Sequence, residues 1–195
     1  MQLDYGRLTE TLSRTPGAAA PGGCYSLSAV CLVLFDRPAT TILAIVKADH
    51  ASDYPWGGHV ALPGGRVTGL DPDAQATALR ELQEEVGIAA MDVAVLGDLG
   101  HFQTIDSSHD LQVIVCQWNQ RCELQPDPRE VARVLELDLG RLIELHGRLG
   151  YGRAGSAEPT LPPRYPWDDV EIWGVTARIL HHFVELVLHN DCTIA

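Results

Sequence analysis

Basic residues are scarce in this chain of 195 residues. It holds 14 lysines and arginines against 26 aspartates and glutamates, which gives a formal net charge of −12 at pH 7. Proteins that bind the nucleic-acid backbone rely on clustered lysines and arginines, so this balance argues against a nucleic-acid partner. An anionic small-molecule ligand would need a metal ion or a local basic patch to offset the negative field.

Paired cysteines and long apolar runs are also missing. The five cysteines are odd in number and form no Cys-x-x-Cys pair, so neither a disulfide framework nor a zinc site is indicated. The first residues lack both a basic start and an apolar core, and no run approaches the roughly 20 apolar residues that span a membrane. These features predict a cytoplasmic protein without a membrane partner.

The apolar residues, 46% of the chain, are enough for one substantial core, and the length favours one domain. Leucines at helical spacing predict a short helix at the N-terminus, followed by a breaker-rich linker. We therefore expect residues 1–22 to form a helix and linker, and residues 23–195 to form the main domain. Apolar periodicity predicts strands within 25–35, 40–48, 91–102 and 111–118, a strand running into a helix within 130–149, and a terminal helix over 171–190.

A further helix is predicted from Pro72 to Val86. Asp71 suits the N-cap, Pro72 suits the first helical position, and Gly87 suits the position just past the end. With 1.5 Å per residue, this helix would be roughly 22 Å long.

Three glutamates crowd this helix at a spacing where like charges repel. Glu81, Glu84 and Glu85 lie within an arc of roughly 100° that borders the apolar stripe. A solvated face would mix charges of both signs and lie farthest from the core. Carboxylates at the edge of a core, beside Gly64 and Gly65, favour a hard cation such as Mg²⁺ or Mn²⁺, with the Gly64 carbonyl as a further candidate ligand. On the glutamates alone, an ordinary solvated acidic helix is the alternative.

The stretch LPGGRVTGLDPDAQATALRELQEEVGI, residues 62–88, resembles the Nudix box of the Nudix hydrolases. In that box a glycine loop leads into a helix that ends Arg-Glu-apolar-x-Glu-Glu-x-Gly-apolar. Residues 80–88 match every position of this ending. The resemblance implies an α/β/α sandwich built on a central mixed sheet. It also implies metal-dependent hydrolysis of a nucleoside diphosphate linked to another group.

The spacing within the box resembles that of the coenzyme A pyrophosphatase subgroup. Asp71 stands six positions after Gly65, where the commonest box has glutamate, and eight residues separate it from Arg80. The subgroup's upstream pattern is not followed, because Ala44 replaces a threonine and Lys47 stands in for an arginine. On the spacing of the box, coenzyme A or a derivative is the leading substrate. ADP-ribose, dinucleoside polyphosphates, nucleotide sugars and a damaged nucleoside triphosphate are the alternatives.

The resemblance implies roles for the residues of the box. Glu81, Glu84 and Glu85, with Gly64, would hold one or more Mg²⁺ ions, with Mn²⁺ as the possible substitute. Glu81 or Glu84 would also help to deprotonate the attacking water. Arg80 is expected to orient a glutamate by a charge-assisted hydrogen bond, in preference to touching the substrate.

An acid outside the box serves as base or ligand in many Nudix enzymes. Asp106, Asp110 and Glu130 are candidates, and each is as readily a surface loop acid. Glu130 is preferred because it precedes the apolar run VARVLEL and can be held against the sheet. Asp71 is expected to be only the N-cap.

The residues expected to bind substrate are Lys47, Gly65 and His59. His59 comes just before the glycine loop and can reach a phosphate, although a structural histidine is the alternative. Trp173 can stack on an adenine, but large aromatic side chains more often belong to the core. Gly65 belongs to the glycine-rich loop, His59 comes just before that loop, and Lys47 belongs to the strand predicted within 40–48.

The strongest competing function is a Nudix-fold module that senses a nucleotide without cleaving it. Such a protein is expected to have lost a glutamate of the box, and none is missing here. The N-terminal helix and the apolar terminal helix make a homodimer possible. His181 and His182, on that terminal helix, group with no other residue in the sequence.

Overall fold

The computed structural model describes residues 1–14, 26–49, 57–104, 109–151 and 162–194. Within them, five strands lie in one sheet in the order β4 (Val60–Ala61), β3 (Thr40–Lys47), β2 (Ser26–Asp36), β7 (His109–Trp118) and β6 (Val93–Gln103). The sheet is completed by β5 (Gly64–Arg66), which pairs with β2, and β8 (Val131–Asp138), which pairs with β3. Because β2 and β7 run parallel while β2 and β3 run antiparallel, the sheet is mixed.

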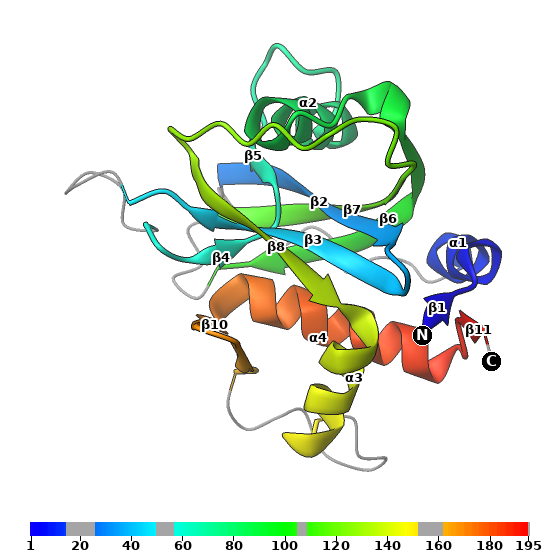
Figure 1. Cartoon of the computed structure of the whole chain (residues 1–195). Coiled ribbons are helices and arrows are strands. Elements are labelled where there is room, and N and C mark those ends of the chain that lie inside the picture. Colours follow the sequence, from blue (N-terminus) through cyan, green and yellow to red (C-terminus); the bar gives the residue numbers. More distant parts are fainter. Residues whose placement is uncertain (15–25, 50–56, 105–108, 152–161, 195) are drawn as a thin grey trace.

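Helices cover both faces of this sheet (Figure 1). One face carries α2 (Ala74–Val86), and the other carries α3 (Leu139–Arg148) and α4 (Gly174–His189). The predicted α/β/α sandwich with a central mixed sheet is therefore confirmed. The shorter elements are α1 (Tyr5–Arg14), the 3₁₀ helix η1 (Ala90–Asp92), the pair β1 (Gln2–Leu3) and β11 (Thr193–Ile194), and the pair β9 (Tyr165–Trp167) and β10 (Val170–Ile172).

Strand β2 shows why the sheet is buried on both faces. Successive side chains of a strand point to opposite faces, so an unbroken apolar run supplies both. Every second residue packs with α2, and the residues between them pack with α4. The α2 side takes Ala29, Cys31, Val33 and Phe35, and the α4 side takes Val30, Leu32 and Leu34. The strands predicted within 25–35, 40–48, 91–102 and 111–118 are confirmed, with boundaries shifted by a few residues.

The start of α2 differs from the prediction. The helix begins at Ala74, and its N-cap is Asp73, whose side chain accepts a hydrogen bond from the Ala76 N–H. The prediction that Asp71 caps the helix is therefore wrong. Its carboxylate instead accepts hydrogen bonds from Thr77 and Arg80. The predicted end at Val86 is confirmed, with Gly87 in the left-handed conformation just past it.

The terminal helix also starts later than predicted. Glu171 and Ile172 belong to β10 and pair with Pro166 and Tyr165, so α4 begins only at Gly174. Ile172 and Tyr165 are both fully buried. The spacing of apolar residues in the sequence suits a helix here, but it does not show that these side chains pack into the core from paired strands. Their burial outweighs the local preference for a helix.

The short N-terminal helix is present as α1. Its Leu8 and Leu12 are buried in the same apolar cluster as the inner face of α4. The linker falls within residues 15–25, outside the described residues, so the division of the chain at residue 22 stays a prediction. No helix in the part of the chain that the structure describes is long and apolar enough to cross a membrane.

Candidate active site

The three glutamates of α2 lie in different environments. The side chain of Glu84 is 54% exposed, that of Glu81 is 15% exposed, and that of Glu85 is 1% exposed. This gradient follows from helical geometry, because the acidic arc begins in solvent and ends at the buried stripe. One end of the arc therefore faces water, while the other enters the interface between α2 and the sheet.

The short strand β5 brings its glycines against two of these carboxylates. The Gly64 N–H donates a hydrogen bond of 2.9 Å to Glu85 Oε2. A β-carbon on Gly65 would lie 2.4 Å from the carboxylate carbon of Glu81, and one on Gly64 would lie 2.3 Å from the carbonyl oxygen of Ala29. At Gly64 the obstructing atoms belong to the backbone of β2, so a larger residue would not fit there, whereas a β-carbon on Gly65 would force the Glu81 carboxylate to move.

Arg80 connects the acids on the solvent side of the helix. Its guanidinium donates to Glu84 Oε2 at 2.6 Å and approaches Glu81 Oε1 at 2.8 Å. It also donates to both carboxylate oxygens of Asp71, at 3.2 and 3.3 Å from Nε. Arg80 thus contacts the carboxylates of both Glu81 and Glu84, and its role in orienting them for the reaction stays a prediction.

Asp71 belongs to this charged group although the sequence suggested only a cap. The hydrogen bonds from Arg80, and those from Thr77 and Thr68, lower the pKa of the Asp71 carboxyl below its ordinary value. In turn, the hydrogen bond to Asp71 raises the pKa of Arg80 above its ordinary value, so this arginine stays charged. Asp71 thus completes the positioning of Arg80 from the loop before the helix.

Glu85 is paired with Lys47 from strand β3. The Lys47 ammonium donates a hydrogen bond to Glu85 Oε1, and only 12% of the Lys47 side chain is exposed. Burial raises the pKa of the Glu85 carboxyl, while Lys47 and the Gly64 N–H oppose that rise. The pair joins the helix to the sheet at the inner end of the acidic arc.

The acids expected outside the box lie at different places. Glu130 is exposed, its backbone carbonyl accepts from the Ala48 N–H at 2.9 Å, and its charge contributes to the raised pKa of Glu85. It is therefore near the inner end of the arc. Asp110 is buried; its Oδ2 lies 2.6 Å from His101 Nδ1, and its Oδ1 has no hydrogen-bond partner among the described residues. Asp106 lies outside the described residues.

A cavity of about 720 Å³ opens beside the glycine strand. All three residues expected to bind substrate, Lys47, His59 and Gly65, line it. Its far wall is the start of α4, where the ring of Trp173 meets that of His59 edge to face with centroids 4.7 Å apart. The structure thus gathers these side chains around one space, and substrate contact by each of them stays a prediction.

Arg66 was missed in the sequence, although it directly follows the two glycines. It is exposed and lines the cavity, while Lys47 is paired with Glu85. The position directly after the glycine pair was the signal that could have found it.

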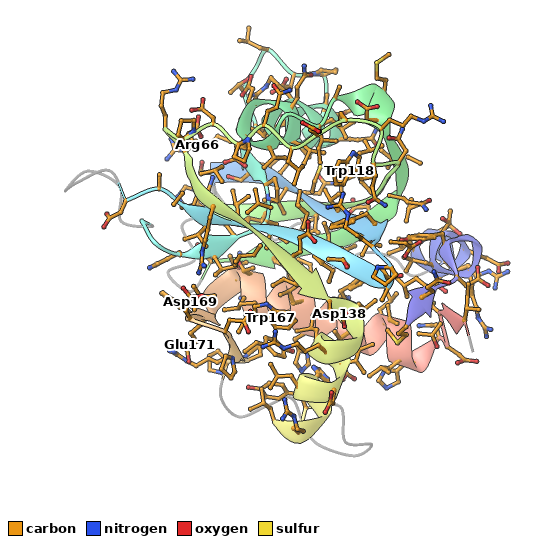
Figure 2. The ribbon with its side chains drawn as sticks, viewed as in Figure 1. Arg66, Trp118, Asp138, Trp167, Asp169 and Glu171 are labelled. Carbon is orange, nitrogen blue, oxygen red and sulfur yellow. The ribbon has the colours of Figure 1, made fainter. Side chains whose placement is uncertain are left out.

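Figure 2 shows Arg66 and Trp118 at opposite ends of the α2 side, and Trp118 is buried with its ring 5.4 Å from that of Phe35. Trp118 is therefore a core residue.

Comparisons with known proteins agree with this geometry. A family model of the NUDIX domain matches residues 26–149. The "Uncharacterized Nudix hydrolase NudL" of Yersinia pestis (strain Pestoides F) is 33% identical over 165 residues, which cover 82% of this chain and 79% of that protein.

Two solved structures share the fold at low sequence identity. A MutT/nudix family protein from Enterococcus faecalis has a TM-score of 0.56 and 14% identity, covering 93% of this chain and 68% of that chain. The binary complex of a C. elegans Ap4A hydrolase has a TM-score of 0.54 and 14% identity, covering 84% of this chain and 98% of that chain. At such identity, these two structures support the fold alone.

Proposed function

The chain belongs to the Nudix hydrolase family, and on that premise we propose that it cleaves the pyrophosphate bond of a nucleoside diphosphate linked to another moiety. The family identifies the chain as a hydrolase that acts on pyrophosphate bonds of small nucleotides. The observation that carries the narrower proposal is the complete set of box glutamates, gathered by Arg80 and the glycine strand beside a cavity of about 720 Å³.

Nudix hydrolases generally need divalent metal ions, and the donor set on α2 fits a hard cation. The side chains of Glu81, Glu84 and Glu85 offer only carboxylate oxygens, which suit Mg²⁺ or Mn²⁺. We assign Mg²⁺ to these residues, with the Gly64 carbonyl as a further ligand. When bound, such an ion neutralises the anionic oxygens of the pyrophosphate and lowers the pKa of water.

The neighbours of the three glutamates hold these side chains in place. Arg80 holds Glu81 and Glu84 through its two terminal nitrogens, which limits the rotamers of both side chains. Lys47 and the Gly64 N–H stabilise the ionised form of Glu85 against its burial. This arrangement supports a site that is organised before the substrate arrives, which lowers the cost of positioning during the reaction.

Glu81 is our first choice for the group that takes a proton from the attacking water. Its carboxylate lies against Gly65, which lines the cavity, although none of the three glutamates is itself among the lining residues. Glu84 and Glu130 are the alternatives for this role. Glu84 is more exposed, and Glu130 comes from the loop before β8.

Coenzyme A or a derivative remains the leading substrate, on the strength of the sequence around the box. Two residues with cationic side chains, Lys47 and Arg66, line the cavity. Arg66 is exposed at the wall, and Lys47 is engaged by Glu85. ADP-ribose, dinucleoside polyphosphates, nucleotide sugars and nucleoside triphosphates are the alternatives, and a sensing module without hydrolysis is the alternative from another class. The homodimer, the lack of a nucleic-acid partner and the cytoplasmic setting stay predictions.

A substrate panel tests this proposal. Coenzyme A, ADP-ribose, a dinucleoside polyphosphate, a nucleotide sugar and a nucleoside triphosphate would each be incubated with the protein and Mg²⁺ or Mn²⁺. Released mononucleotide would be followed by chromatography. We expect turnover of coenzyme A in the presence of the metal ion and none after chelation.

Two variants, each replacing a glutamate by glutamine, provide a test of the box and its matched control. Glu84→Gln removes an acid of the box, and Glu144→Gln removes an exposed acid of α3 on the opposite face of the sheet. Turnover of ADP-ribose but not coenzyme A would reject the preferred substrate while retaining the hydrolase. Binding of a nucleotide without turnover of any compound would instead support the sensing module.

A further inference from the structure

A second group of metal-ligating side chains lies on the other side of the sheet from α2. His146 comes from α3, and His181 and Glu185 come from α4. One candidate ligand atom from each residue lies within 4.8 Å of those of the other two. His181 and Glu185 are four residues apart, so both project from the same side of α4.

The two ring nitrogens of His146 face different partners. Its Nδ1 lies 2.9 Å from the hydroxyl oxygen of Tyr165, and its Nε2 lies 2.5 Å from Glu185 Oε1. In metal sites the outer ring nitrogen of a histidine usually bonds a fixed neighbour, which sets the tautomer and orients the inner nitrogen. Tyr165 is fully buried and can serve as that neighbour.

Within this group His146 is buried, while His181 and Glu185 are partly exposed. Only 1% of His146 is exposed, and the rings of Tyr151 and Tyr165 pack near it. Buried polar and charged groups in proteins are hydrogen-bonded, paired or bound to metals. A hydrogen-bonded pair between His146 and Glu185 provides a polar partner for two of the three side chains. The His181 ring, with its centroid 4.9 Å from that of His146, brings a second imidazole to the same place.

We propose that His146, His181 and Glu185 bind a divalent transition metal ion of the Zn²⁺ class. Two imidazole nitrogens and one carboxylate oxygen are a ligand set used by zinc, and they leave a fourth tetrahedral position for water. The glutamates of α2, in contrast, offer only oxygen atoms and favour a hard cation. The cysteine spacing in the sequence indicated no zinc site, and the site proposed here uses no cysteine.

The required movement of the side chains is small. In a tetrahedral zinc site with bonds of about 2.1 Å, neighbouring ligand atoms lie roughly 3.4 Å apart. His146 Nε2 and Glu185 Oε1 would therefore move apart from 2.5 Å, and the His181 ring would move closer to them. The bound ion would connect α3 to α4, two helices whose ligands are 39 residues apart in the chain.

Metal titration of the untagged 195-residue chain tests the proposal. The α2 site would first be disabled by Glu81→Gln with Glu84→Gln, so that the remaining sites are measured alone. We expect this double variant to bind one equivalent of Zn²⁺ in equilibrium dialysis. With Co²⁺ as the probe, we expect the visible absorption bands of a tetrahedral ion.

Further substitutions in the double variant identify the ligands. His181→Ala is expected to weaken Zn²⁺ binding at least 100-fold and to abolish the Co²⁺ bands. Tyr165→Phe, which removes only the hydrogen bond to His146, is expected to weaken binding by about 10- to 100-fold. His182→Gln is the matched control, because His182 is the next residue of α4 and contacts Phe102 instead. It should leave binding unchanged.

Two results would overturn the proposal. One is a double variant that binds no Zn²⁺ and gives no tetrahedral Co²⁺ spectrum. The other is equal binding by the His181→Ala and His182→Gln forms. Circular dichroism would establish that each variant is folded. If His181→Ala does not fold, Glu185→Gln carries the same test, and full binding by a folded Glu185→Gln form would overturn the proposal.

Discussion

The two ends of the acidic arc on α2 are built differently. The outer end consists of Glu81, Glu84, Arg80 and Asp71, and its side chains are held by one guanidinium near solvent. The inner end consists of Glu85 and Lys47, which form a buried pair between the helix and the sheet. Glutamates only a few residues apart in one helix therefore experience different balances of solvation and charge.

This difference predicts which substitutions on α2 first affect turnover and which first affect folding. An exposed acid costs little to keep ionised, so it is available for a metal ion or a proton. A buried acid must be compensated by a partner, and removing that partner leaves a costly charge. We therefore expect changes at the outer end to affect turnover, and changes at the inner end to affect folding first.

The largest effect is expected from Glu81→Gln at the outer end. This change keeps the shape of the side chain but removes the charge that we assign to metal binding and water activation. Turnover should fall by about 10²- to 10⁴-fold, while the thermal unfolding midpoint stays near that of the wild type. Steady-state kinetics on the substrate cleaved in the panel, with Glu144→Gln in parallel, would measure it. Equal activity of both variants would refute the assignment.

Lys47→Met tests the inner end. Breaking a buried ion pair from one side typically costs about 3–5 kcal/mol of unfolding free energy, because the other charge is left without a partner. Urea denaturation would measure the loss. Arg133→Met is the control, since it breaks an exposed pair with Asp169 and should cost at most about 1 kcal/mol. Similar losses in both variants would remove the distinction between the two ends.

Gly65→Ala tests whether close approach of β5 sets the position of Glu81. The new methyl group would displace the Glu81 carboxylate, and a misplacement of about 1 Å can cost about 10²-fold in rate. Gly69→Ala is the control, because a β-carbon there would meet no atom within 4 Å. Kinetics and unfolding would be measured for both. A fully active Gly65→Ala variant would show that Glu81 does not depend on this contact.

The smallest effect is expected from Asp71→Asn. The folded-state pKa of Asp71 lies below its ordinary value of 3.8, so the carboxylate contributes stability above that pH and loses it as the pH falls further. The variant should therefore be slightly less stable than the wild type at pH 7, with a difference that disappears in acid. Thermal unfolding between pH 2 and pH 7 would measure it. A difference that grows in acid would contradict the sign.

The box and α2 were predictable because they are continuous in sequence. The apolar period defined the buried side of α2, Gly87 marked its end, and the spacing of the glutamates located the acidic arc. The start of the helix was not predictable, because Asp71 is diverted by Arg80, nine residues further along. Local capping preferences do not include such a competing partner.

Contacts between distant residues were beyond the sequence. Lys47 and Glu85 are 38 residues apart, and only the packing of α2 on the sheet brings them together. His181 seemed isolated because its neighbour His146 lies on another helix. In both cases the residue types were visible in the sequence, but their proximity depends on the fold.

Manganese binding at the outer end tests the central claim most directly. Mn²⁺ would be titrated into the wild type and into the Glu81→Gln, Glu84→Gln double variant, with the free ion followed by its electron paramagnetic resonance signal. We predict that the wild type binds at least one Mn²⁺ ion and that the double variant binds it at least about tenfold more weakly. Equal binding by the two proteins, both folded, would contradict a metal site on α2.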